Sequence, residues 1–152
     1  MSARFPPVGQ LVPHRGSALL IERVLEERVD GITCSGRVPA GAPLVRDGRV
    51  PSFVGLEMAA QAAAAYEGLQ RLRQSPQDEP RIGYLVSLSD VAVERPEMAV
   101  DVPFVVTVRS LAGVSPLFRC EAMVEGDGGV YVRGVLTTMV APAPPRDEAS
   151  AP

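Results

Sequence analysis

The sequence is poor in the side chains that hold metal ions or carry redox chemistry. Its 152 residues include one histidine, His14, and two cysteines, Cys34 and Cys120. The cysteines form no CxxC motif and no cluster with the histidine. We therefore expect two buried free thiols, with no disulfide, metal or organic cofactor. Because histidine is the side chain whose charge changes near neutral pH, a single copy narrows the acid–base chemistry open to the chain.

The sequence also lacks the marks of membrane, secreted and nucleic-acid-binding proteins. No uncharged apolar run has the length of a membrane-spanning helix, and residues 1–7 contain no apolar core of a signal peptide. The net charge is −3, and no basic run is present that would follow a phosphate backbone. We expect a cytoplasmic protein without membrane or nucleic-acid partners.

What remains is an ordinary globular composition, with 46% hydrophobic and 22% charged residues. The length favours one domain with a sizeable core, which we assign to residues 1–140. Residues 141–152 are rich in proline and alanine and carry mixed charges, so we expect a disordered tail.

Residues 51–74 are predicted to form one long helix. Ser52 is a suitable N-cap, and the residues that follow are mostly good helix formers. Apolar residues recur at helical spacing along one stripe, and the first three turns are apolar nearly all round. Such a helix is expected to be buried on every side.

Glu57 is the exception within this apolar segment, and Gln61 follows it one helical turn later. A carboxyl in apolar surroundings is either a functional acid, since desolvation favours its neutral form, or a structural group. In the structural case Glu57 faces a small water-filled gap or pairs with an arginine. Gln61 either orients Glu57 or bridges elements of the fold.

The rest of the chain is predicted to be β-structure. Two short segments precede the helix and could form a hairpin, and four longer ones follow it, with a strong turn signal at residues 126–129. The expected strands are residues 18–24, 29–38, 82–94, 102–108, 118–124 and 130–140. Pro103 places the start of its strand at an edge or outside the ladder. The pattern indicates an α+β fold with the helix laid across an antiparallel sheet.

Two motifs resemble a known family. Leu11-Val12-Pro13-His14-Arg15, followed by the strand at residues 18–24, resembles the opening of hot-dog-fold (3R)-hydroxyacyl-acyl-carrier-protein dehydratases. Residues 54–61, Val-Gly-Leu-Glu-Met-Ala-Ala-Gln, are similar to that family's helix start, in the variant of the aryl-polyene branch. The resemblance covers roughly residues 8–140. It implies an antiparallel sheet of five to six strands wrapped around one long central helix, in a homodimer or a heterodimer with another hot-dog subunit.

The resemblance also implies a reaction. Such a protein would eliminate water from 3-hydroxyacyl thioesters on acyl carrier protein, in fatty-acid-like or polyene and polyketide biosynthesis. Glu57 would be the acid, or the residue that binds the hydroxyl and water. Gly55 N–H would donate to the thioester oxygen, and Gln61 would orient Glu57. Typical members carry a catalytic histidine in the loop before the helix, and residues 36–51 contain none. His14 is then the substitute base, in a family whose histidine and acid meet across the dimer interface.

Other interpretations stay open at this stage. His14 could be a structural loop histidine, and the chain could be a non-catalytic or half-active subunit that pairs with a catalytic dehydratase. Alternatively, Glu57 could activate water in a hot-dog thioesterase. Four arginines are candidates for a basic patch that receives an acidic carrier protein: Arg46, Arg49, Arg71 and Arg73.

Overall fold

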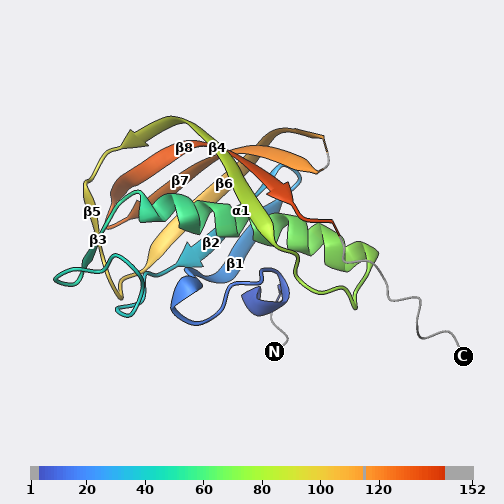
Figure 1. Ribbon diagram of the computed structural model, residues 1–152, viewed down its shortest axis with the longest axis horizontal. Coiled ribbons are helices and arrows are strands. Elements are labelled where there is room, and N and C mark those ends of the chain that lie inside the picture. The colour runs from blue at the N-terminus through green and yellow to red at the C-terminus, as the bar shows by residue number, and fades with distance from the viewer. Residues whose placement is uncertain (1–3, 115, 143–152) are drawn as a thin grey trace, which may run out of the picture.

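The computed structural model describes residues 4–114 and 116–142, and the predicted tail lies outside them except for its first two residues. One helix, α1 (Val54–Gln74), packs against a six-stranded antiparallel sheet of order β1-β2-β6-β7-β8-β4. Figure 1 shows the sheet arching around α1. The strands of this sheet are β1 (Ile21–Arg28), β2 (Gly31–Gly36), β6 (Phe104–Val114), β7 (Leu117–Gly126), β8 (Gly129–Val140) and β4 (Gly83–Val93). The predicted arrangement of sheet and helix is confirmed.

The structure has short helical turns and strands in segments for which the sequence predicted no regular structure. Two 3-10 turns, η1 (Val8–Gln10) and η2 (Gly16–Ala18), precede the first strand. The second turn takes up Ala18, so β1 starts three residues later than predicted. A separate two-stranded sheet pairs β3 (Arg49–Pro51) with β5 (Glu97–Ala99), which the sequence did not indicate. This small sheet lies directly before α1 in the chain.

The start of α1 differs from the prediction. The helix begins at Val54, its N-cap is Phe53, and no side chain caps it. The N–H of Ser52 donates to Pro96 O over 2.9 Å, which holds Ser52 at the end of β3. Its Oγ is buried and has no hydrogen-bond partner in the described part of the chain. The cap assignment to Ser52 is therefore wrong, because strand pairing decides the orientation of this residue.

The core lies between α1 and the concave face of the sheet. Fully buried alanines let the helix approach the strands closely, and larger side chains from the sheet fill the remaining space. The helix contributes Met58, Ala59, Ala62, Ala63 and Ala65, and the sheet contributes Ile32, Phe104, Val106, Val132 and Leu136.

The two edges of the sheet differ strongly. Five of the eight residues of β1 are charged, whereas β4 has one charged residue, Asp90, among its eleven. All of β4 except Ala92 is exposed, including six large hydrophobic residues. The alternation predicted for this strand is present in sequence, but neither face of β4 is covered in the single chain.

Candidate functional site

The candidate site forms where the segment before β1 meets α1, and Gln61 connects the two. The Gln61 side chain is fully buried, and its Oε1 accepts from Leu20 N over 2.8 Å. Its Nε2 donates to Ala18 O over 2.8 Å and to Glu57 Oε1 over 3.2 Å. Because the backbone on both sides of Leu19 sets the orientation of the amide, its donor is held toward Glu57.

Glu57 and His14 meet at the same place. His14 Nε2 lies 3.3 Å from Glu57 Oε1, the oxygen that also accepts from Gln61. The structure thus brings together three of the residues predicted from sequence, and it does so within one chain. This differs from the arrangement that the resemblance implied, in which the histidine and the acid come from different subunits.

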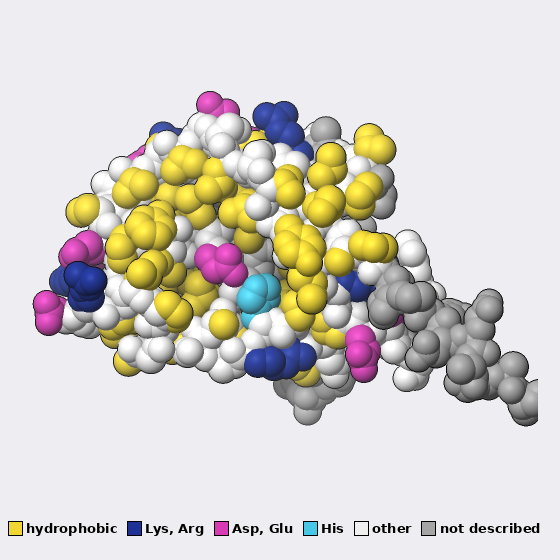
Figure 2. Space-filling view, viewed as in Figure 1, with side chains coloured by type: hydrophobic (Ala, Val, Ile, Leu, Met, Phe, Trp, Pro, Cys, Tyr) yellow, Lys and Arg dark blue, Asp and Glu magenta, His cyan; other side chains and the backbone are white. Residues whose placement is uncertain are grey.

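The surroundings of Glu57 correct one expectation. Its side chain is 50% exposed and that of His14 is 29% exposed, whereas the sequence predicted a carboxyl enclosed by apolar groups. The reason is that this face of α1 looks toward the open edge of the sheet, where Phe53 is also 53% exposed. Figure 2 shows the histidine and an acidic side chain next to one another on a face dominated by hydrophobic side chains.

Gly55 does not join this group. Its N–H donates to Ser52 O over 2.9 Å, so the predicted bond to a thioester oxygen would require that contact to open. The residue faces the sheet instead, and a Cβ placed on it would lie 2.7 Å from Val132 Cγ1 and 3.3 Å from Val124 Cγ2. Glycine is required here by the close approach of α1 to β7 and β8.

Replacing Gly55 with alanine is therefore expected to destabilise the fold. Valine side chains have restricted rotamers, so the overpacking should cost about 1–3 kcal/mol and outweigh the better helix propensity of alanine. Urea unfolding would measure the loss. Gly41→Ala is the matched control, because no atom lies within 4 Å of a Cβ at that position. Equal unfolding midpoints for the two variants would contradict this account of the packing.

A cavity of about 70 Å³ extends from His14 and Glu57 along α1. Its helical wall is the stripe Glu57, Ala60, Ala64, Glu67 and Arg71, which recurs at helical spacing. Strands β4 and β8 form the opposite wall with Tyr84, Leu85, Thr138 and Val140. The sequence pointed to other alanines as the source of space beside the helix, but Ala59, Ala62 and Ala63 are buried in the core.

Glu67 is a site residue that the sequence reasoning missed. It lines the cavity, and burial raises the pKa of its carboxyl to about 7. Burial, and to a lesser extent the charge of Glu67, raises the pKa of Cys120 in β7 to about 12. In the sequence, Glu67 is the first charged residue after a run of alanines, which predicts that it begins the solvent-exposed face of the helix.

The four arginines proposed as a basic patch do not form one. Arg46 and Arg49 precede α1, whereas Arg71 and Arg73 lie in its last turn. About 20 helical residues, or roughly 30 Å, separate the two pairs. Arg73 pairs with Glu27, and Arg71 donates to Gln10 O over 3.0 Å. These arginines therefore offer no single surface for an acidic carrier protein.

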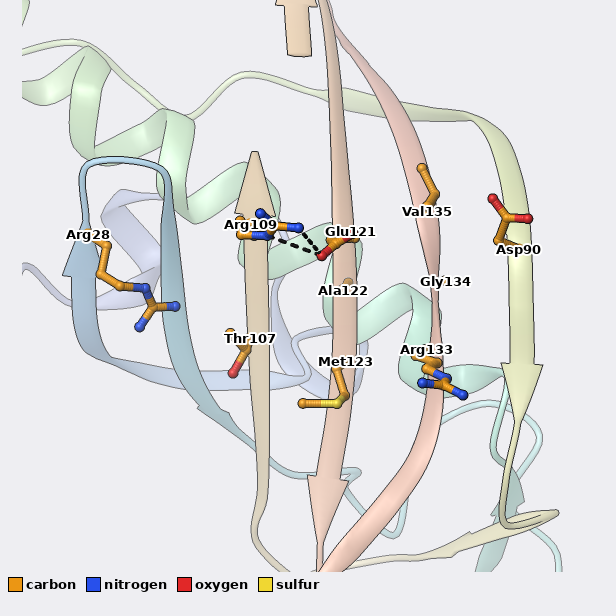
Figure 3. Close-up of a pocket in the computed structure, with 10 residues that line it drawn as sticks. All are labelled: Arg28, Asp90, Thr107, Arg109, Glu121, Ala122, Met123, Arg133, Gly134 and Val135. Atoms are coloured by element: carbon orange, nitrogen blue, oxygen red, sulfur yellow. Dashed lines mark hydrogen bonds and ion pairs between the residues drawn. The ribbon is translucent and has the colours of Figure 1, made fainter. Parts of the chain in front are cut away.

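A larger hollow of about 490 Å³ lies on the outer face of the sheet, away from α1 (Figure 3). Each of its three arginines forms an ion pair, one of them with a glutamate of the hollow and two with glutamates outside it. Arg109 pairs with Glu121, Arg133 with Glu94 and Arg28 with Glu26. No histidine reaches it, and it is separated from the Glu57 site by the sheet. We therefore place the candidate site on the helix side.

Within the residues that the structure describes, no group of three His, Cys, Asp or Glu side chains could hold a metal ion. Cys34 and Cys120 are free and buried. In the part of the chain that the structure describes, no helix is both long and apolar enough to cross a membrane.

Comparison with known proteins identifies the fold and the family. The solved dehydratase heterocomplex ApeI:P from Xenorhabdus doucetiae is similar with a TM-score of 0.80, at 23% identity over 91% of this chain and 93% of that chain. Cj0977, a sigma28-regulated virulence protein from Campylobacter jejuni, gives a TM-score of 0.61 at 9% identity over 88% of this chain and 95% of that chain.

A hypothetical thioesterase from Streptococcus pneumoniae, solved with coenzyme A, gives a TM-score of 0.55 at 10% identity over 78% and 84% of the two chains. At these identities the likenesses show the hot-dog fold alone. No curated protein matches the chain. The family described as ApeP-like, ApeP dehydratase, matches residues 6–149. Because that match spans nearly the whole sequence, the chain belongs to the ApeP-like dehydratase family.

Proposed function

We propose that this chain eliminates water from 3-hydroxyacyl thioesters carried on an acyl carrier protein, in fatty-acid-like or polyene and polyketide biosynthesis. The observation that carries the proposal is the contact of His14 and Glu57 beside Gln61, at the open end of a cavity that follows α1. The dehydratase family supplies the reaction class. The carrier-bound substrate rests on the resemblance of residues 11–24 and 54–61.

The proposed reaction moves two protons. His14 Nε2 removes a proton from C2, and the electron pair of that bond forms the double bond between C2 and C3. The bond from C3 to oxygen breaks, and the hydroxyl leaves as water after taking a proton from Glu57. Glu57 Oε1 is occupied by Gln61, which leaves Oε2 for this proton. Gly55 N–H is the donor that the resemblance suggests for the thioester oxygen, on which negative charge develops, and this role requires its bond to Ser52 O to open.

The test is an assay of the purified chain with a 3-hydroxyacyl thioester, in which mass spectrometry follows enoyl product and free acid together. We expect enoyl product from the wild type and a loss of about 10²–10⁴-fold in His14→Ala, the usual contribution of a general base. His14→Gln is the companion variant, since its longer amide can approach the position of Nε2 beside Glu57 but cannot act as a base. Full activity in either variant would exclude His14 as the base, and free acid without enoyl product would indicate a thioesterase.

A second candidate is a half-active subunit that completes its site with a catalytic partner. The loop before α1 lacks the histidine that typical dehydratases place there, and the Glu57 carboxyl is half exposed. The similar ApeI:P structure is a heterocomplex. Under this candidate the isolated chain would be inert on every thioester, and activity would appear when the partner subunit is added.

Both candidates involve association with a second hot-dog subunit, for which β4 is the proposed interface. An exposed edge strand presents unpaired backbone groups to another chain, and charged residues normally protect such edges. The charges of β1 provide that protection, and β4 has almost none. A partner that pairs with β4 would also cover its exposed hydrophobic side chains and the open face beside Glu57.

A further inference from the structure

The segment that leads to His14 is packed tightly against α1. Leu11 and Val12, which follow the turn η1, are almost fully buried. Gly68 lets this segment reach the helix backbone, since a Cβ placed on Gly68 would lie 2.7 Å from Leu11 O. Close-packed contacts of this kind leave little freedom of movement. Residues 8–12 therefore form a rigid base on the helix.

His14 lies beyond this base, between η1 and η2, and has few anchors of its own. Among the described residues, neither its backbone N–H nor that of Arg15 donates a hydrogen bond to another backbone group. Its Nε2 contacts Glu57, but its Nδ1 is buried and has no hydrogen-bond partner in the described part of the chain. A histidine that transfers protons is usually oriented by a bond at its second ring nitrogen. The orientation of this imidazole therefore depends on how its backbone is held.

The Arg15 side chain folds back over the segment and holds that backbone. Its Nη1 donates to Val12 O and to His14 O, each over 2.7 Å. Its Nη2 donates to Gly9 O over 2.8 Å. A guanidinium is planar and rigid, so carbonyls bonded to one such group keep a fixed arrangement. The Arg15 side chain thus connects the carbonyl of His14 to two residues of the rigid base.

We propose that Arg15 is a positioning residue, which holds the backbone of His14 so that Nε2 stays beside Glu57 Oε1. The inference rests on the proposed function, because it takes His14 to be the base. Reacting groups must keep their geometry closely, and a displacement of about 1 Å can lower a rate by about 100-fold. Arg15 is exposed and does not line the cavity at Glu57, so its loss should affect the chemical step more than substrate binding or folding.

A double-mutant cycle tests whether Arg15 acts through His14. With a 3-hydroxyacyl thioester, Arg15→Ala should lower kcat by about 10–100-fold and leave KM within about twofold of wild type. In a His14→Ala background the same change should have almost no effect, because no base remains to be positioned. Arg15→Lys keeps the charge but not the planar fork, so an intermediate kcat is expected. Equal losses of kcat in the two backgrounds would overturn the inference.

A second measurement requires no turnover. His14 is the one histidine of the sequence, so the imidazole signals in an NMR spectrum belong to it. In the full chain, or in its complex if one forms, wild type should show nuclear Overhauser contacts between this ring and the Glu57 side chain. Arg15→Ala should weaken or lose these contacts while its Tm stays near that of wild type. Arg119→Ala, the same change at an exposed position of β7, is the matched control and should keep them.

The NMR measurement separates the failure of this inference from the failure of the proposed function. An inert wild type whose ring contacts depend on Arg15 would contradict the proposed reaction but support the hold of Arg15 on His14. Unchanged ring contacts in Arg15→Ala would overturn the inference at any level of activity. Should Arg15→Ala unfold, Arg15→Lys serves in both measurements with the same criteria.

Discussion

Replacing Glu57 with glutamine is expected to reduce enoyl formation by about 10³-fold while leaving the protein folded. An acid that donates a proton in the transition state typically contributes about 10²–10⁴-fold, and the amide of glutamine cannot replace it. The fold should survive because the new side chain has the same shape and its oxygen can still accept from Gln61 Nε2. Michaelis–Menten kinetics with a 3-hydroxyacyl thioester would measure the loss in kcat, on the chain alone or on its complex.

Two variants sharpen this experiment. Glu79→Gln makes the same change at an exposed position and should behave as wild type. Glu57→Asp keeps a carboxyl but withdraws it by one methylene from the position beside His14 Nε2, so partial activity is expected. If Glu57→Gln kept most of the wild-type kcat, the proton donor would have to be a different group, and the assignment of this site would fail.

The second large effect concerns association through β4. Leu88 is a large hydrophobic residue near the centre of the strand and is exposed in the single chain. Leu88→Lys would place a charge on an edge that must lose its water when a partner binds. The dissociation constant should therefore increase at least about 30-fold, which corresponds to the loss of an interface contact worth roughly 2 kcal/mol. Sedimentation velocity over a concentration series would report the change in dissociation constant.

Val29→Lys is the control for this experiment, because Val29 is fully exposed in the turn between β1 and β2 on the opposite edge of the sheet. It should leave association unchanged. The experiment applies equally to a homodimer and to a complex with a different hot-dog subunit. Should Leu88→Lys associate as tightly as wild type, another surface must form the interface.

The sequence predicted the helix and most of the sheet because their signals are local. The good helix formers of residues 54–74 and the alternation of residues 118–140 determine secondary structure almost on their own. The short strands β3 and β5 escaped prediction because three residues carry too little periodicity. Their pairing also explains why Ser52 does not cap α1.

The site was predictable only in part. The motifs singled out His14, Glu57 and Gln61, and the structure places these residues next to one another, but within one chain and not across a dimer interface. The exposure of Glu57 was not predicted, because an apolar surface that a second subunit covers has the same sequence pattern as a surface buried within one chain. Glu67 was missed because helical periodicity does not show which of several alanine-lined stripes borders a cavity.

The burial of both native cysteines has a practical consequence for labelling. Burial raises the pKa of Cys34 and of Cys120 to about 12, and thiol reagents react with the thiolate. Near neutral pH, a cysteine introduced on the surface would therefore be modified selectively without removal of the native pair. A spin label or fluorophore at an exposed position such as Val86 could then follow the approach of a second subunit directly in solution.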